Sequence, residues 1–398
     1  MIFSWLFSCT SAELFTENER KIILRMLQEE IPKTDLSNQY TDTPAVQEFG
    51  EALFFDNRLS KENTISCSTC HDPNKGWSDG KILSEGRSTT SRHAPSLWGT
   101  AYYRWYNWDG SCDSLWCQAT GPIEKPGEMG LTRVSLVHML HNNPDLQQTY
   151  EEFFGALPEA SSWPASASPH IQASTEEHTA WESLSITEQN SATEVLVNIA
   201  KSIAAFQHTI IPPQAPIDNF VRIFAEDEQA AIESISAEQE YGLRLFIGDG
   251  QCHLCHSGSL FSDSQFHNIG LPTVESTDIE DLGRYQGIET IRSHPFQQAG
   301  IWSDDPLGEE AEQLSRLLQT SEDLGRYKTP SLRQVAHTAP YMHTGQFESL
   351  YDVFAHYSNP SLVPTQGHTE DLLIPLDWGE EEINALIQFV QMVSNDIE

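Results

Sequence analysis

The sequence predicts a mainly α-helical protein of two packed domains with few short strands, and three observations support this class. The chain has 398 residues, which is more than one hydrophobic core usually holds. Apolar residues recur at helical spacing in several segments, whereas strand signals are few and short. One order of segments also occurs twice: a capped helix, a Cys-x-x-Cys-His motif, long loops and a further helix. We therefore expect an N-terminal unit (residues 1–215) and a C-terminal unit (residues 216–398).

The N-terminal unit is expected to contain four helices. Their apolar spacing and their Ser or Thr caps place them at residues 11–31, 50–63, 131–150 and 194–207. Polar residues together with Gly, Pro, Ser and Thr dominate residues 72–100, which predicts loops. Residues 158–181 are rich in Ser, Ala and Pro, so we expect a surface insertion there.

The C-terminal unit begins where residues 212–219 interrupt the helical pattern. A capped helix at residues 236–246 then leads into the second Cys-x-x-Cys-His motif. A final amphipathic helix is expected at residues 380–393. Because the same order of segments serves both units, we expect each unit to wrap around a cofactor of its own.

The composition is that of a globular protein with a strongly acidic surface. Hydrophobic residues make up 38% of the chain, and the formal net charge is -36. A field of this sign repels nucleic acid, which excludes nucleic acid as a partner. It favours a partner with a basic patch, although a solvated acidic surface without a specific partner has the same composition.

No stretch of 18 or more apolar residues occurs, so the sequence predicts no transmembrane helix. Residues 1–9 are apolar but short and without basic residues, which makes them a poor complete signal peptide. The run from Leu6 to Cys9 resembles a lipoprotein cleavage motif. Lipid attachment at Cys9 and a wrongly assigned start codon are therefore both open.

Two Cys-x-x-Cys-His motifs carry the chemistry: Cys67-Ser-Thr-Cys70-His71 and Cys252-His-Leu-Cys255-His256. This is the attachment motif of c-type haem. Two thiols on one helical turn add to the haem vinyl groups, and the imidazole of the next residue then faces the iron. A structural zinc site is the alternative, but it needs four ligands in a closed site. The repeat of the motif about half a chain apart predicts two covalently bound haem c groups.

The remaining cysteines do not form a disulfide framework. Seven cysteines are present, and four of them belong to the two motifs. Cys112 and Cys117 lie close in sequence to Trp108, and we expect either a local disulfide or two buried thiols there, without a catalytic role.

Further fragments of the sequence, in their order and spacing, resemble one known family over nearly the whole chain. They are residues 50–60 (GEALFFDNRLS), 94–97 (APSL), 108–110 (WDG), 118–119 (QA), 121–122 (GP), 128–129 (EM), 242–246 (GLRLF), 266–268 (FHN), 328–333 (KTPSLR) and 339–343 (APYMH). The chain resembles the superfamily of di-haem cytochrome c peroxidases and MauG. Residues 104–110 and 113–116 are most similar to its MauG-like branch that includes MbnH, whose members are associated with copper-handling proteins and oxidise a Trp in a partner protein.

The resemblance implies that peroxide reacts at the first haem and that the second haem stores or relays electrons. His71 and His256 would be the proximal ligands of the two irons. Trp108 matches the indole that passes electrons between the haem groups in this family. Packing of an ordinary core aromatic is the alternative for Trp108.

Three residues match the pocket above the open face of the first haem. Glu128 would move a proton from the inner to the outer oxygen of peroxide, because a positioned carboxylate can act as acid and base. Gln118 would hold a ligand or a water molecule, and Pro122 would shape access to the pocket. The alternative for Glu128 is a solvated acid at the start of a helix.

The far-side ligand of the second haem is the most informative position. In the family's peroxidases that accept electrons from small cytochromes it is Met, whereas the matching residue here is Tyr357. A phenolate oxygen favours oxidised iron, and a thioether favours reduced iron. Tyr is the MauG-like choice, and the adjacent His356 is a competing ligand. MauG also has a Trp two residues before its second motif for outward electron transfer, but Gly250 stands there in this chain.

The resemblance also implies a calcium ion between the domains, held by the backbone carbonyls of Thr338 and Pro340. The family usually adds an Asn side chain, and His93 stands at that position here. The calcium prediction is correspondingly weaker. The peroxidases' distal His also has no counterpart near Glu85 and Gly86.

These expectations combine into a predicted function. We expect a periplasmic oxidoreductase that uses hydrogen peroxide to form a high-valent di-haem state and then oxidises a Trp or Tyr of a partner protein through Trp108. A copper-associated protein is one candidate for the partner. Insertion of c-type haem takes place outside the cytoplasm, which sets the compartment. The alternative is a cytochrome c peroxidase that detoxifies peroxide with electrons from a small cytochrome or cupredoxin. A non-catalytic electron-transfer cytochrome is the third reading, and it leaves Glu128 and Gln118 without a purpose.

Overall fold

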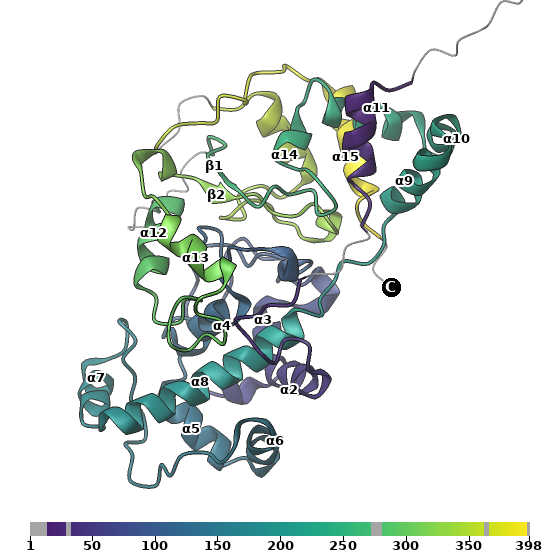
Figure 1. The fold of residues 1–398 in the computed structure, drawn as a ribbon. Coiled ribbons are helices and arrows are strands. Elements are labelled where there is room, and N and C mark those ends of the chain that lie inside the picture. The colour runs from purple at the N-terminus through teal and green to yellow at the C-terminus, as the bar shows by residue number, and fades with distance from the viewer. Residues whose placement is uncertain (1–13, 29–32, 272–280, 362–365, 396–398) are drawn as a thin grey trace, which may run out of the picture.

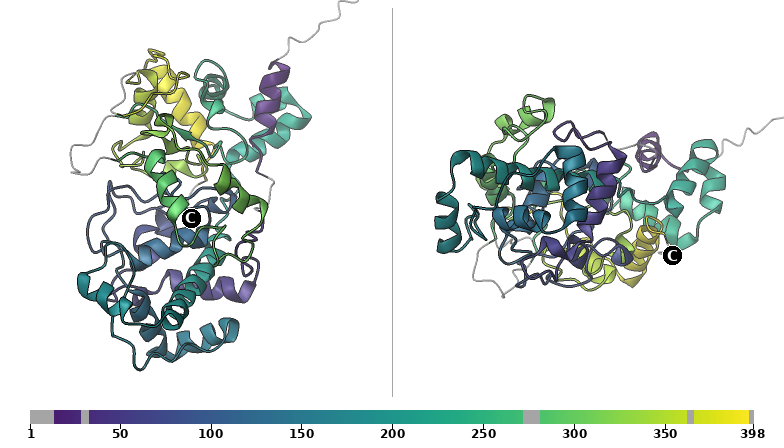
Figure 2. Two further views of the ribbon diagram at one scale, coloured as in Figure 1. Left: turned by 60° about the vertical axis from the view of Figure 1, so that its left-hand side comes forward. Right: turned by 90° about the horizontal axis from the view of Figure 1, so that it is seen from below.

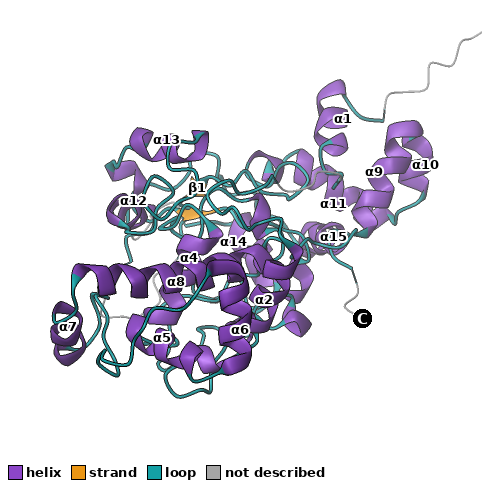
Figure 3. Ribbon diagram, turned by 60° about the horizontal axis from the view of Figure 1, so that its bottom comes forward, coloured by secondary structure: helices purple, strands orange, loops and turns teal. Residues whose placement is uncertain are grey.

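The computed structural model of the protein describes residues 14–28, 33–271, 281–361 and 366–395. The described chain is mainly helical, which confirms the predicted class (Figure 3). Its one regular sheet is an antiparallel pair, β1 (Phe266–His267) and β2 (Tyr327–Lys328), with Phe266 opposite Lys328. Cys9 lies outside the described residues. No helix in the described ranges is long and apolar enough to cross a membrane.

The helices gather in two regions with the sheet and long loops between them (Figures 1 and 2). One region contains α2 (Pro44–Phe54), α3 (Cys67–Cys70), α4 (Leu115–Glu124), α5 (Arg133–His141), α6 (Pro144–Phe154), α7 (Thr175–Glu182) and α8 (Ile186–Gln207). The other contains α1 (Glu17–Leu24), α9 (Pro216–Glu226), α10 (Glu228–Glu233), α11 (Ala237–Ile247), α14 (Leu350–Ser358) and α15 (Glu380–Gln391). Helices α12 (Arg284–Ser293) and α13 (Glu309–Arg316) lie along one side.

Several helix bounds differ from the sequence prediction for identifiable reasons. The helix expected at residues 131–150 is two helices, because Pro144 cannot continue α5 and instead begins α6. The helix expected at 194–207 starts earlier, at a capping box of Ser185 and Glu188. The helix expected at 50–63 is α2, which starts at Pro44 and ends at Phe54.

A glycine crossing repeats in the two regions. A Cβ atom on Gly50 of α2 would lie 1.9 Å from the backbone oxygen of Ser202 in α8. A Cβ atom on Gly242 of α11 would likewise lie 2.0 Å from the backbone oxygen of Ala385 in α15. Only glycine allows these close approaches. The helix before each Cys motif is therefore locked against a later helix in the same way.

Aromatic packing follows each glycine crossing. In both helices of each pair, a phenylalanine follows four residues after the crossing. Phe54 packs on Phe206 at 5.3 Å between ring centroids, and Phe246 packs on Phe389 at 4.9 Å. Residues four apart lie on the same face of a helix. The glycine and the phenylalanine thus share one buried stripe in both regions.

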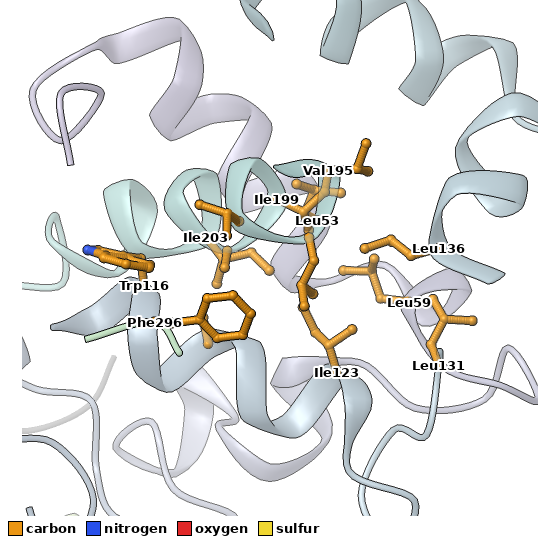
Figure 4. Close-up of a cluster of buried hydrophobic side chains, with 14 of the residues drawn as sticks. Leu53, Leu59, Trp116, Ile123, Leu131, Leu136, Val195, Ile199, Ile203 and Phe296 are labelled. Atoms are coloured by element: carbon orange, nitrogen blue, oxygen red, sulfur yellow. The ribbon is translucent and has the colours of Figure 1, made fainter. Parts of the chain in front are cut away.

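Two hydrophobic clusters fill the interior, and they cross the predicted boundary near residue 215 in both directions. Phe15, Ile23 and Met26 belong to the cluster of α11 and α15. Phe296 and Leu314 belong to the cluster of α4 and α8, where Phe296 lies near Trp116 and Ile123 (Figure 4). Each unit therefore completes the core of the other, and the domain boundary itself stays a prediction.

The segment expected to be a surface insertion contributes to the core. Ala160, Trp163 and Ala167 within residues 158–181 are buried in the N-terminal cluster, and the indole N–H of Trp163 donates to Glu188 at 3.1 Å. The Ser, Ala and Pro content, which suggested a loop, reflects residues small enough to pack beside α5 and α8.

Candidate functional site

The first Cys motif occupies one helical turn. Cys67 and Cys70 are the ends of α3, with Ser66 as the N-cap residue, and burial raises the pKa of their thiols to about 12 and about 11. The Nδ1 atom of His71 lies 3.1 Å from the carbonyl oxygen of Trp77. A hydrogen bond at Nδ1 leaves Nε2 available as a metal ligand and fixes the plane of the ring.

The second Cys motif has the same arrangement. Cys252 starts a short 3-10 turn (Cys252–Leu254), and burial raises the pKa of its thiol to about 12. The Nδ1 atom of His256 lies 2.9 Å from the carbonyl oxygen of Phe261. Both histidines thus face a backbone acceptor with Nδ1, as histidines that ligate haem iron do.

The loop that orients each histidine is held by matching serine hydroxyls. Trp77 and Phe261, which supply the acceptor carbonyls, both have a positive φ, of 59° and 53°, which is unusual for bulky residues. Four hydroxyl-to-carbonyl hydrogen bonds of 2.6–2.8 Å hold these strained positions: Ser96 to Gly76, Ser78 to Ala94, Ser331 to Leu260 and Ser262 to Thr329.

Trp108 lies where the two units meet. It is in a hairpin closed by a bridge between Tyr106 and Cys112, and a matching bridge between Tyr341 and Phe347 closes the hairpin of His343. The rings of Trp108 and His343 are 6.4 Å apart between centroids. The hairpins are therefore equivalent elements that face each other.

Reciprocal backbone hydrogen bonds join each hairpin to the segment that precedes the other hairpin. The N–H of His93 donates to the carbonyl of His343, and the N–H of Lys328 donates to the carbonyl of Trp108, both at 2.8 Å. The same number of residues separates His93 from Lys328 as separates Trp108 from His343. The contact therefore has an approximate two-fold axis, with the indole and the imidazole beside it.

Charged and aromatic groups surround this contact. His343 stacks on Tyr327 at 3.6 Å between ring centroids, and the Arg92 guanidinium lies 5.6 Å from the centre of the Tyr327 ring. Arg92 also forms ion pairs of 2.7 Å with Asp109 and Asp281. Sequence reasoning missed this network because its five members are well separated along the chain.

The residues predicted for the peroxide pocket come from α4 and the turn after it. Gln118 and Pro122 are four residues apart on α4, so they share a face of the helix. Glu128 follows in the turn, with Lys125 Nζ at 2.7 Å from its carboxylate. Burial lowers the pKa of His71, and the carboxylates of Asp79 and Glu128 partly oppose this shift. Glu128 therefore lies close enough to the first motif to act on His71, and its role in a peroxide pocket stays a prediction.

Tyr357 lies near the second motif. It belongs to α14, and burial raises the pKa of its phenol, with a further contribution from Cys255 and Cys252. Among the described residues none forms a hydrogen bond with its hydroxyl. The adjacent His356 is engaged elsewhere, since its Nε2 lies 2.9 Å from the carbonyl oxygen of Ile269. A half-buried phenol whose hydroxyl has no hydrogen-bond partner among the described residues fits a haem ligand.

The calcium prediction finds no support in the side chain of His93. Its Nδ1 faces the carbonyl of Lys81 at 2.7 Å and its Nε2 faces the hydroxyl of Ser78 at 3.3 Å, and calcium prefers oxygen ligands in any case. His93 does not fit that site. The carbonyl groups of Thr338 and Pro340 stay a prediction.

Two further placements were not visible in the sequence. Cys112 and Cys117 are buried free thiols, the second of the two expected states, and His294 lies beside them. At the other end of the molecule, the Trp378 indole fills the space beside Gly250, because a Cβ atom on Gly250 would lie 3.1 Å from it.

The two motifs, their oriented histidines and the helical fold define a di-haem c-type cytochrome. Residues 44–226 match the model of the family described as di-haem cytochrome c peroxidase. The chain is 33% identical over 350 residues to cytochrome-c peroxidase IdrP1 of Denitromonas iodatirespirans, covering 87% of this chain and 80% of that protein. It is 31% identical over 362 residues to methylamine utilization protein MauG of Methylorubrum extorquens, covering 88% and 78%.

The fold agrees with a solved structure. A MauG-like protein associated with microbial copper homeostasis superposes with a TM-score of 0.63 at 21% identity, covering 92% of this chain and 94% of that one. Together with the relatives above, this shows that the chain belongs to the di-haem cytochrome c peroxidase and MauG family. It is therefore an oxidoreductase, and the family implies two covalently bound haem c groups.

Proposed function

We propose that this protein is a MauG-like oxidoreductase of the periplasm that uses hydrogen peroxide to oxidise a Trp or Tyr of a partner protein over a distance. The observation that carries the proposal is Tyr357 beside the thiols of the second motif. The peroxidases that accept electrons from small cytochromes have Met at this position. Phenol oxygen favours oxidised iron, so this haem site suits storage of oxidising equivalents.

The residues present fit two haem groups. Cys67 and Cys70 would attach one and Cys252 and Cys255 the other, with an oriented imidazole following each pair. When bound, the haem groups would supply the redox chemistry by which peroxide takes up two electrons and two protons to give two water molecules. The protein would supply proton transfer, orientation and the path for electrons.

Proton transfer would be the task of Glu128. Its carboxylate lies near the first motif and is one-quarter exposed, so it can exchange protons with solvent through Lys125 or water. It would take a proton from the inner peroxide oxygen and return it to the outer one. Gln118 would bind the outer peroxide oxygen through its side-chain amide. The ring of Pro122 has no atom that could ligate the iron, so the position for peroxide would stay open.

Electrons would reach the centre through aromatic side chains. Trp108 lies between the units with its N–H bonded to the carbonyl of His93 at 2.9 Å, so its indole is held in one orientation. Trp378 is half-buried and its indole lies against Gly250, two residues before the second motif, which makes it our candidate for the outer end of the path.

The partner is expected to be basic where it docks, since the net charge is -36. A copper-associated protein is one candidate, because the MauG-like protein of similar fold is described in that context. Attachment of c-type haem takes place outside the cytoplasm, which supports a periplasmic location.

A second function, peroxide detoxification with electrons from a small donor protein, is favoured by the 33% identity to a cytochrome-c peroxidase. The two functions differ in what the fully oxidised protein does. We would mix oxidised holoprotein with one equivalent of peroxide, without reductant, and record absorption by stopped flow. A MauG-like enzyme responds at once with a long-lived change at both haem groups. A response that appears only after reduction of one haem would replace our proposal with the second function.

A further inference from the structure

Three metal-ligating side chains meet in the interior of the protein, apart from the two haem motifs. One ligand atom from each of Cys112, Cys117 and His294 lies within 4.8 Å of the other two. The Sγ atom of Cys117 is 3.5 Å from Nδ1 of His294. The two cysteines are unbridged and only 4% and 0% exposed. This cluster, which we call the Cys2His cluster, has no role in the proposed function.

Each donor of the Cys2His cluster is held by a different element. Cys112 is paired with Tyr106 across the hairpin, with a backbone hydrogen bond of 2.8 Å. Cys117 lies in the first turn of α4, where its N–H donates to the N-cap hydroxyl of Ser114 at 3.1 Å. His294 is the C-cap residue of α12. The backbone thus brings the donors together before any ligand binds, as a metal site requires.

The protonation pattern also suits a metal. The N–H of Phe296 donates to Nδ1 of His294 at 3.2 Å, so Nδ1 is the unprotonated nitrogen, and a bound ion would take the place of this hydrogen bond at its lone pair.

We propose that Cys112, Cys117 and His294 bind one thiophilic d10 cation, either Zn²⁺ or Cu⁺. Two thiolates and an imidazole are donors that these ions prefer, and Zn²⁺ would complete its four ligands with a water molecule. Ca²⁺ and Mg²⁺ need oxygen ligands instead. Binding forms two metal–sulfur bonds and one metal–nitrogen bond and releases two thiol protons, without any change of oxidation state. The ligated site is neutral with Zn²⁺ and carries one negative charge with Cu⁺.

The location gives such an ion a defined consequence. It would tie the hairpin that presents Trp108 to α4, which presents Gln118 and Pro122, and to the end of α12. The ion would then fix the indole relative to the peroxide pocket. In the C-terminal unit, Phe347 and Asp352 stand at the positions equivalent to Cys112 and Cys117, so that unit lacks both thiols of the cluster.

The test begins with the holoprotein carrying both haem groups, purified without chelators. We expect about one Zn or Cu per chain by elemental analysis, and an X-ray absorption spectrum at that metal's edge with sulfur and nitrogen neighbours. The edge that carries the signal distinguishes Zn²⁺ from Cu⁺. If the metal is lost in purification, loading with Zn²⁺ alone and with Cu⁺ alone under reducing conditions should restore the same stoichiometry.

Matched variants decide which residues hold the ion. Cys117→Ser should abolish stoichiometric metal binding, and the milder His294→Gln should weaken it at least about tenfold, a loss of 1.4 kcal/mol. His138→Gln is the control, because His138 is also half-buried but faces only the carbonyl of Pro164. A disulfide between Cys112 and Cys117, detected as thiols that cannot be alkylated after denaturation without reductant, would overturn the proposal. So would reduced thiols that take up neither ion, or a metal content unchanged in Cys117→Ser.

Discussion

The N-terminal and C-terminal units use one scaffold in two copies. In each, a glycine brings the first helix onto a later helix, a phenylalanine pair follows, and a carbonyl at positive φ orients the motif histidine. The hairpin and the helix after it are also equivalent, since both helices start at a serine N-cap. These shared features fix backbone and histidine positions and say nothing about chemistry.

The differences lie at equivalent positions on that scaffold. Trp108 corresponds to His343, and the same number of residues further on Pro122 corresponds to Tyr357. The N-terminal unit therefore presents a ring without a donor where the C-terminal unit presents a phenol. Glu128 and Gln118 belong, like Pro122, to the N-terminal unit. The comparison teaches that one unit is arranged to leave room for a reactant, and the other to fill the same place with a ligand.

The largest effect is expected at Glu128. The substitution Glu128→Gln removes the proton-transfer group of the N-terminal unit alone and should slow the reaction with peroxide about 10²–10⁴-fold. Stopped-flow rates against peroxide concentration measure it. Glu17→Gln is the control, since Glu17 is exposed, is also paired with a lysine, Lys21, and has no place in the predicted pocket. Equal rates in both variants would remove the functional contrast between the units.

Replacing Tyr357 should make the C-terminal unit behave like that of a cytochrome-accepting peroxidase. In Tyr357→Met the thioether would favour reduced iron, so the response of the fully oxidised protein to peroxide should fall at least about tenfold and return after one-electron reduction. Tyr351→Met, an exposed position on the same helix, should leave the response unchanged. An unchanged response in Tyr357→Met itself would mean that another side chain fills the ligand position.

The shared scaffold predicts that equivalent glycine substitutions lower the free energy of unfolding equally in the two units. Gly50→Ala and Gly242→Ala would each force a Cβ atom against a backbone oxygen, and each should lower the free energy of unfolding by about 3 kcal/mol. Gly121→Ala meets no atom within 4 Å and should be neutral or stabilising by up to about 1 kcal/mol. Thermal unfolding of the holoproteins measures this, and a large difference between the first two would break the equivalence.

The smallest effect concerns the contact between the units. Burial disfavours ionisation of Asp281, but the hydrogen bond from Arg92 outweighs it and lowers the pKa of the carboxyl to about 2. Because the folded value lies below the ordinary value of 3.8, the stabilisation is present above about pH 4 and is lost as the pH falls toward 2. We expect at most about 2 kcal/mol. Acid unfolding of Asp281→Asn should lack this component, and an identical pH profile would contradict the assignment.

Much of the fold followed from the sequence because the repeated order of capped helix and Cys motif is local information. The mainly helical class is confirmed, and the helix bounds failed where a cap or proline lay outside the apolar pattern, as at Ser185 and Pro144. The buried role of residues 158–181 could not be predicted, because small residues in a loop and small residues packed in a core have the same composition.

The candidate site could likewise be predicted only in part from the sequence. The motif histidines and their cysteines are contiguous, so they could be named directly, and the resemblance supplied Glu128, Gln118, Trp108 and Tyr357. His294 could not be found, since 177 residues separate it from Cys117. The sequence showed that His93 stands where the family usually has Asn. Only the structure shows that both ring nitrogens of His93 contact other groups, the carbonyl of Lys81 and the hydroxyl of Ser78.

The reciprocal hydrogen bonds at the two hairpins have a consequence for ancestry. A contact in which His93 meets His343 while Lys328 meets Trp108 is the self-complementary contact of a symmetric dimer. Duplication and fusion of a single-haem cytochrome that once paired with its own copy would produce it. In such a dimer any substitution alters both sites at once. Joining two such copies in one polypeptide would let each half mutate separately, so that a tryptophan could stand opposite a histidine in a contact that keeps its approximate two-fold axis.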